Sequence, residues 1–221
     1  MDTFQTIRDR RSTKHYDPRH TLSDAEEQLL IDLALEAPSS FNVQHWRLVN
    51  VKNPEVRARL REAAFDQEQV TDASLLFVVC ADVKAWRKDP ARYWRNAPLN
   101  VQNTLLPMMH AFYEGKEQLQ RDEAIRSTGF LAQNIMLTAK AMGYESCPLI
   151  GFDPEAVARI IDLPEDHLIS MLITVGKGTV PAWPKPGHLD QSELVFRDGF
   201  VRKDLTETRS TVNGPGFWAS I

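Results

Sequence analysis

The sequence predicts one soluble domain that contains both helices and strands, followed by a C-terminal tail. The chain has 221 residues, of which 43% are hydrophobic and 25% charged, as in ordinary globular domains. Residues 73–81 (ASLLFVVCA) form a continuous apolar run of strand length, which is typical of a central strand covered on both faces. Residues 23–26 (SDAE) form a capping box that opens a helix. From Gly176 onward the composition shifts to Pro, Gly, Lys and polar residues, which cannot form a core of their own.

Charge and cysteine content exclude several classes of protein. The net charge of −4 gives no general basic field, so we expect no nucleic-acid partner, and any anion site must be local. Cys80 and Cys147 are the only cysteines, which indicates a reducing compartment rather than a disulfide framework. The N-terminus has no apolar signal region, and no segment approaches the roughly 18 apolar residues of a membrane span. We therefore expect a cytoplasmic protein without a membrane partner.

The first half of the chain predicts three helices and two strands. Asp2 can cap a short helix that carries Phe4 and Ile7 on one face, and Pro18 ends the segment after it. The helix opened by Ser23 carries an apolar stripe and stops at Pro38. A polar loop over 37–46 leads into a strand at 47–51, and residues 53–55 (NPE) cap the next helix, before the apolar strand at 73–81.

The second half begins with its least regular part, residues 82–120. Its aromatic residues lie among charges, which fits a mobile lid or a partner surface and equally an ordinary helical hairpin. Residues 127–142 predict the strongest helix, with Gly143 as its left-handed stop and an apolar arc wide enough for a subunit interface. A strand at 144–147, a helix from 153 that ends near 163, and a last core strand at 168–175 follow.

Two polar segments are candidates for binding. Residues 10–14 (RRSTK) combine two guanidinium groups, two hydroxyls and an ammonium, which are the donors that bind phosphate. The alternative is that these are solvated residues at a helix end. In the loop 37–46, Asn42 and Gln44 carry both donors and acceptors, which suits the edge of a heterocycle, although turns and caps also use such residues.

Three motifs in this order and spacing, RRSTKHYDP, APSSFNVQHW and CPLIGFDPEAV, resemble those of the FMN-dependent nitroreductase family over roughly residues 3–200. The resemblance implies an α+β fold with a mostly antiparallel central sheet flanked by helices. It also implies an intertwined homodimer with two FMN sites at the interface. Residues 1–180 would form the FMN-binding domain, and residues 181–221 a C-terminal arm that packs on the partner subunit.

The resemblance also implies the role of particular residues. Arg10, Arg11 and Ser12 would hold the FMN phosphate, and Lys14 would reach the ribityl chain or the pyrimidine oxygen. The loop 38–42 would approach the same flavin from the other subunit, while residues 148–151 back the ring with an amide near Ile150 or Gly151 facing N5. The full set of implied cofactor-binding residues is Arg10, Arg11, Ser12, Lys14, Pro38, Ser39, Ser40, Asn42, Gln69, Pro148, Leu149, Ile150, Gly151, Lys185 and His188.

Some positions depart from the family pattern. His45 stands where Pro often precedes the Trp, and Ile150 stands where some relatives have Glu. Asp66 and Gln69 occupy the positions of mid-chain Asn and Lys contacts, and the negative charge of Asp66 leaves its role open. Lys185 and His188 match the C-terminal phosphate-binding cations only loosely. We find no catalytic triad, metal cluster or P-loop, which fits chemistry carried by a cofactor.

The implied activity is an NAD(P)H-dependent oxidoreductase that works in two steps. Hydride would pass from NADH or NADPH to flavin N5 and then to a nitroaromatic or quinone acceptor. One alternative keeps the fold and the flavin but cleaves flavin or removes halogen from aromatic substrates. A second alternative is a module that stores or senses flavin without turnover, and a third is a dimer whose basic run is only surface.

Overall fold

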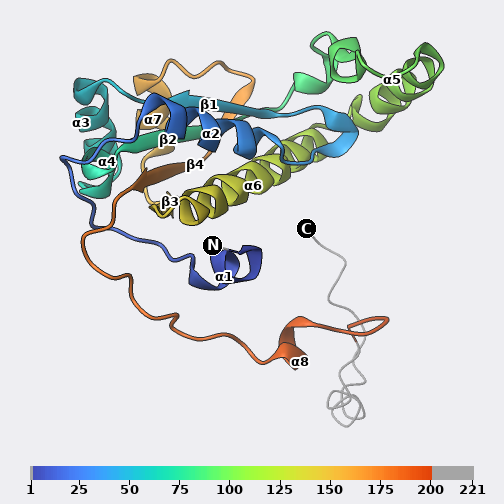
Figure 1. Ribbon diagram of the computed structural model, residues 1–221. Coiled ribbons are helices and arrows are strands. Elements are labelled where there is room, and N and C mark those ends of the chain that lie inside the picture. The colour runs from blue at the N-terminus through green and yellow to red at the C-terminus, as the bar shows by residue number, and fades with distance from the viewer. Residues whose placement is uncertain (1, 201–221) are drawn as a thin grey trace, which may run out of the picture. The chain divides into compact units, whose positions relative to one another are not determined.

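The computed structural model describes residues 2–200 (Figure 1). The chain divides into a first unit, Met1–Trp183, and a second unit, Pro184–Ile221. The described part of the second unit contains one short helix, α8 (Gln191–Leu194). All other described helices and strands belong to the first unit.

The core of the first unit is a four-stranded antiparallel sheet with the order β1-β2-β4-β3. The mostly antiparallel sheet that the resemblance implies is thus confirmed. β2 is buried at every position, because it lies between β1 and β4 and is covered on both faces. β1 and β3 form the two edges. The strands are β1 (Trp46–Asn50), β2 (Leu75–Asp82), β3 (Glu145–Leu149) and β4 (His167–Gly176).

Four of the described helices begin where the sequence places capping residues. Asp2, Ser23, Asn53 and Asp153 each accept a backbone N–H of the first turn of their helix, and Ser23 and Glu26 form the expected reciprocal pair. The helices are α1 (Thr3–Asp9), α2 (Asp24–Leu35), α3 (Pro54–Ala63), α4 (Gln69–Asp72), α5 (Leu99–Tyr113), α6 (Glu117–Ala141) and α7 (Pro154–Ile160). Three 3₁₀ turns are η1 (Ser40–Asn42), η2 (Ala85–Arg87) and η3 (Pro90–Trp94).

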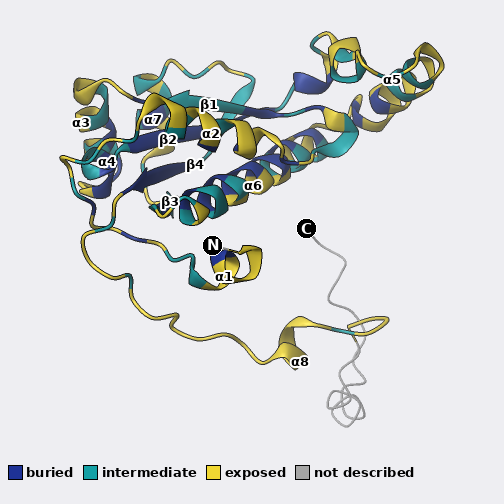
Figure 2. Ribbon diagram, in the orientation of Figure 1, coloured by how far each residue is buried: buried dark blue, intermediate teal, exposed yellow. Residues whose placement is uncertain are grey.

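Each face of the sheet has its own core, and Figure 2 shows the buried strands between helices with exposed outer sides. Successive side chains of a strand point to opposite faces. Phe77 and Val79 of β2 accordingly pack with Leu30 of α2 and Leu131 of α6. The alternate residues of β2, Leu76 and Val78, point to the other face. There they pack with Leu60 of α3, Val70 of α4 and Val157 of α7.

The helix α6 begins ten residues before the expected start at Ser127, so that boundary was wrong. Its first turns bury Gln120 and Ala124 rather than large apolar side chains. The Gln120 side chain donates to the carbonyl of Tyr113 (2.7 Å) and accepts from the Lys84 ammonium. Because polar groups on this buried face are hydrogen-bonded and large apolar side chains are missing from it, the sequence shows no hydrophobic periodicity here.

Residues 82–120 are more regular than the sequence suggested. They contain η2, η3 and the fifteen-residue helix α5, which joins α6 through residues 114–116. This segment has a small core of its own, in which Trp86, Met109 and Tyr113 pack with Val43 of the loop before β1. Among the described residues, no helix combines the length and apolar composition needed to cross a membrane.

Candidate functional site

The basic run 10–14 lies along the outer edge of the sheet, beside β3. Ser12 forms a parallel bridge with Ser146, and the Thr13 N–H donates to the Ser146 carbonyl at 3.0 Å. Thr13 is buried, whereas Ser12 and Lys14 are exposed, as the alternation of an extended segment requires. The edge of the sheet therefore fixes the backbone of this run and directs Ser12 and Lys14 outward.

The cations of this run have no acidic partner among the described residues: no ion pair there includes Arg10, Arg11 or Lys14. The Arg11 guanidinium donates to the carbonyls of Arg8 (2.6 Å) and Arg10 (2.9 Å). Burial raises the pKa of the neighbouring Cys147 thiol, and the charges of Lys14 and Arg10 oppose that rise. The surface beside β3 is therefore electropositive and suited to an anion.

The end of β3 lies next to two glutamines. The Gln67 amide donates to the carbonyl of Gly151 at 2.7 Å, and the Gln69 amide donates to the Gln67 side-chain oxygen at 2.9 Å. Gln69 is buried, whereas Ile150 is exposed over 81% of its surface. The expected residues 148–151 and Gln69 are thus brought into one neighbourhood. Gln67 links them, and no pattern in the sequence singled it out.

Asp66 has a partner within its own segment. Its carboxylate accepts from the Arg61 guanidinium at 2.6 Å, and both Phe65 and Asp66 adopt positive φ. The ion pair closes the turn after α3 and gives Asp66 a structural role.

The loop 38–44 lies at the other edge of the sheet, just before β1. Phe41, Asn42 and Gln44 all have positive φ, which is uncommon for residues other than glycine. Neighbouring hydrogen bonds hold this backbone: the Gln44 N–H donates to the Ser39 hydroxyl at 2.9 Å. The Trp94 indole donates to the Phe41 carbonyl, also at 2.9 Å. The loop is thus clamped to η3, a contact that nothing in the sequence indicated.

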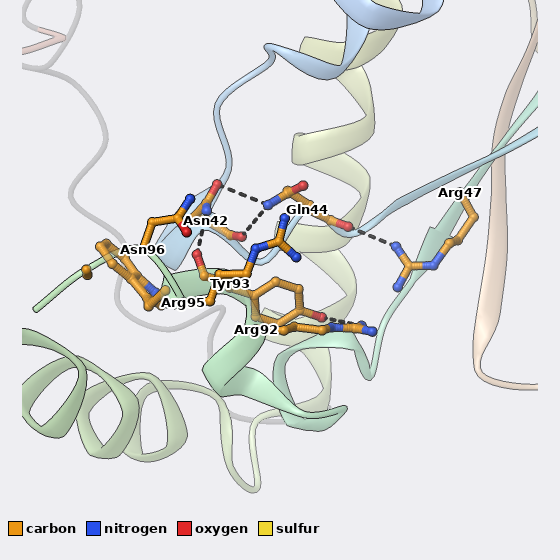
Figure 3. A pocket seen from close by; sticks show the side chains of 9 residues that line it. Asn42, Gln44, Arg47, Arg92, Tyr93, Arg95 and Asn96 are labelled. Atoms are coloured by element: carbon orange, nitrogen blue, oxygen red, sulfur yellow. Dashed lines mark hydrogen bonds between the residues drawn. The ribbon is translucent and has the colours of Figure 1, made fainter. Parts of the chain in front are cut away.

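A cavity of about 630 Å³ lies between this loop and η3 (Figure 3). Dashed lines in the figure join Asn42 to Gln44 and to the carbonyl of Tyr93, and the Arg47 guanidinium to the Gln44 carbonyl. The cavity is lined by Asn42, Gln44, Arg47, Arg92, Tyr93, Trp94, Arg95, Asn96 and Ala97. Of these residues, the sequence singled out Asn42 and Gln44 as candidates for binding, and the resemblance implied a flavin contact for Asn42 alone.

The two halves of the expected site are far apart in one chain. Trp46 is in register with Leu168 across β2, whereas Ser146 is in register with Val175. Three interstrand spacings and seven residues of strand separate the two positions, which amounts to about 27 Å. The loop 38–42 and the run 10–14 of one chain therefore lie at diagonally opposite corners of the sheet.

An ion-pair cluster lies at the end of β2. The buried carboxylate of Asp82 accepts from the Lys88 ammonium and from the Arg47 guanidinium, each at 3.0 Å. Lys88 also pairs with Asp166 at 2.7 Å and holds the pKa of that carboxyl below its usual range. His167 completes the group. Because an ammonium already lies between the two acids, we read the cluster as an internal ion-pair network and not as a metal centre.

Lys185 and His188 belong to the second unit, and their role in a site stays a prediction.

The first unit defines an α+β protein with an electropositive sheet edge and a separate, clamped polar loop. Comparison with known proteins identifies the family to which this chain belongs. The profile of the Nitroreductase family matches residues 7–177. The chain belongs to the nitroreductase family.

Individual relatives are similar over most of their length. The chain is 52% identical over 200 residues to protein DrgA of Synechocystis sp., covering 88% of this chain and 95% of that protein. It is 27% identical to the oxygen-insensitive NADPH nitroreductase of Helicobacter pylori, covering 82% and 90%. A solved structure from Exiguobacterium sibiricum, described as a "putative nitroreductase in complex with FMN", superimposes with a TM-score of 0.82 at 27% identity, covering 89% and 97%.

Proposed function

We propose that this protein is an FMN-dependent NAD(P)H oxidoreductase that reduces nitroaromatic or quinone acceptors. Family membership supports this proposal, as do the NADPH nitroreductase activity named for one relative and the FMN named in one similar structure. Bound FMN would supply the chemistry, with NAD(P)H as hydride donor. The chain itself would bind the flavin, orient it, and stabilise the charge that develops on it.

The observation that carries the proposal is the unpaired cationic run on the edge of β3. Arg10, Arg11 and Ser12 offer guanidinium and hydroxyl donors to a phosphate. The carboxylate next to the run, that of Glu145, accepts from the Thr13 hydroxyl and pairs with Lys140, and no ion pair among the described residues includes Arg10 or Arg11. Ser12 pairs with Ser146 and the Thr13 N–H donates to the Ser146 carbonyl, so the run lies next to the strand that leads into residues 148–151. The donor set fits the phosphate of FMN.

The ring would lie against residues 148–151. Gln67 holds the Gly151 carbonyl, so the peptide at this point has a defined orientation toward a flat ligand. Lys14 would stabilise the negative charge that reduction places on the pyrimidine edge of a flavin. In this proposal no side chain acts as acid or base, and positioning and electrostatics account for the contribution of the protein.

We further propose that two chains share each site. In a single chain the strand positions that adjoin these two segments, Trp46 and Ser146, lie about 27 Å apart, so a second copy would bring Pro38, Ser39, Ser40 and Asn42 to the same ligand. Exposed apolar side chains on α1, α2 and α6 offer an interface: Phe4 (73% exposed), Leu33 (45%) and Phe130 (46%). In this homodimer, residues 181–221, of which 201–221 lie outside the described residues, would form an arm on the partner, with Lys185 and His188 as candidate ligands of the phosphate.

Absorption spectroscopy tests the flavin directly. We expect the purified full-length protein to show flavin bands, or to acquire them with added FMN, and NADPH or NADH to bleach them before a nitroaromatic restores them. A protein that stays colourless and does not bind FMN would refute the proposal. Bound FMN without NAD(P)H oxidation would instead indicate a flavin-binding module.

The phosphate contact has its own test. We expect Arg10→Gln/Arg11→Gln to weaken FMN binding at least tenfold while changing riboflavin binding less, because riboflavin lacks the phosphate. Arg59→Gln on the exposed side of α3 is the matched control for charge loss. Equal losses for the two flavins would show that the run does not bind the phosphate.

A further inference from the structure

The cavity between the loop 38–44 and η3 is strongly cationic in a protein whose net charge is −4. Arg47, Arg92 and Arg95 line it, and no acidic residue is among the described residues that do so. A cavity lined by charges of one sign concentrates ligands of the opposite sign. The question is which of these cations is free to bind.

Arg47 is already neutralised. Its guanidinium pairs with the buried carboxylate of Asp82 at 3.0 Å and donates to the carbonyls of Gln44 (2.9 Å) and Trp46 (2.7 Å). Arg47 therefore helps to hold the loop in place. It does not provide a free charge to the cavity.

Arg92 and Arg95 differ from Arg47 in having no acidic partner among the described residues. The Arg92 guanidinium lies over the Tyr93 ring, 4.9 Å from its centroid, and donates to the Tyr93 hydroxyl at 2.9 Å. Both arginine side chains are exposed, so a dissolved anion can reach them. Each keeps guanidinium N–H groups available for an oxyanion.

The surroundings of these two arginines are fixed. The Tyr93 carbonyl accepts from Asn42 at 2.8 Å, and the Tyr93 hydroxyl donates to the Ala85 carbonyl at 2.9 Å. The Trp94 indole is tied to the Phe41 carbonyl. The segment that carries Arg92 and Arg95 is thus attached on both sides, and its two aromatic rings are held in place beside the cations.

We propose that this cavity selects ligands that carry an anionic oxygen group next to an aromatic ring, with Arg92 and Arg95 as the specificity-determining residues. The rings of Tyr93 and Trp94 offer stacking surfaces, the amides of Asn42 and Gln44 offer hydrogen bonds, and the guanidinium groups bind the anion. The inference deepens the proposed function, on which it rests for its place in the reaction. The anion is then the extra phosphate of NADPH or a carboxylate on an aromatic acceptor.

Binding measured by calorimetry on the full-length protein tests this without requiring turnover. One arm compares adenosine 2′,5′-bisphosphate with adenosine 5′-monophosphate. The other compares 4-nitrobenzoate with its neutral methyl ester. The variant is Arg92→Gln/Arg95→Gln, and the control is Arg87→Gln, an exposed arginine of the preceding turn that does not line the cavity.

We expect the wild-type protein to bind the more anionic member of one pair about tenfold or more tightly than the less anionic member. The double variant should lose that preference, while its affinity for the less anionic member stays within about twofold of the wild-type value. A lost preference in the first arm assigns the anion to NADPH, and one in the second assigns it to the acceptor. The inference would be overturned if the wild-type protein bound both members of each pair equally. It would also be overturned if the double variant kept the preference, or if Arg87→Gln abolished it to the same extent. The flavin spectrum reports separately on the proposed function.

Discussion

Two glutamine side chains connect the turn after α3 to the residues that follow β3. Gln69 is buried and donates to Gln67, which in turn donates to the carbonyl of Gly151. Gly151 has no side chain, and a Cβ built there would approach the Gln67 amide at 3.5 Å. The backbone at Gly151 is therefore held by a side chain from another part of the sequence.

Removal of that contact should loosen the surface on which the proposed ring lies. A hydrogen bond of this kind contributes about 0.5–1.5 kcal/mol, so we expect Gln67→Ala to weaken FMN binding by about two- to tenfold. FMN fluorescence quenching measures the change. Gln28→Ala, which removes an exposed amide bonded to Asp32 on α2, is the control. Unchanged FMN affinity in Gln67→Ala would show that the contact serves only the fold.

Residues that could be predicted at this scale were those whose chemistry is local. The charges of Arg10 and Lys14 and the caps at Ser23 and Asp153 are visible in a few consecutive letters. Gln67 and Arg95 were missed because their importance depends on partners far away in the sequence. Only the folded chain brings the Gly151 carbonyl to Gln67.

His45 joins two elements, the start of β1 and the middle of α6. It is fully buried, and its Nδ1 lies 3.2 Å from the Ser127 hydroxyl, while its Nε2 has no partner among the described residues. Burial lowers the pKa of His45 to about 4, and the neighbouring Asp82 opposes this only in part. The folded protein therefore keeps His45 neutral over most of the physiological range.

This predicts a pH dependence of stability. Between the unfolded pKa near 6.5 and the folded value of about 4, the unfolded chain binds the proton and the folded chain does not. The His45 contribution is complete above pH 6.5 and is lost as pH falls, by about 1.4 kcal/mol per pH unit. Chemical denaturation at pH 7 and pH 5 measures it.

His45→Gln removes the titration, so its destabilisation relative to wild type should be smaller at pH 5 than at pH 7. His15→Gln, an exposed position near the basic run, is the control. Parallel stability curves for wild type and His45→Gln would contradict this account of the buried imidazole.

At the scale of elements, the spacing of apolar residues and the capping residues were sufficient to predict an element whose buried face is apolar. The buried strand β2 and the helices α2, α3 and α7 appeared where the sequence placed them, within a few residues. The first part of α6 did not, because its buried face contains Gln120 and Ala124. The turns η2 and η3 were also missed, since their order depends on hydrogen bonds such as that between Tyr93 and Ala85.

At the scale of the whole molecule, the strand order decides what one chain can do alone. β1 and β3 are the two edges of the sheet, and each edge carries one half of the proposed site. The strand order and register could not be read from the sequence except through the resemblance to a family, because strand pairing depends on contacts between distant residues. The separation of the halves follows from that order.

Mixed dimers test the shared site most directly. One chain carries Arg10→Gln/Lys14→Gln, the other carries Ser40→Ala/Asn42→Gly, and differently tagged copies are purified together. If each site combines the run 10–14 of one chain with the loop 38–42 of its partner, the mixed dimer contains one undamaged site. We therefore expect one tightly bound FMN per two chains, whereas dimers of either variant alone bind FMN weakly. Weak binding by the mixed dimer at every site, as in the two parent variants, would contradict the account.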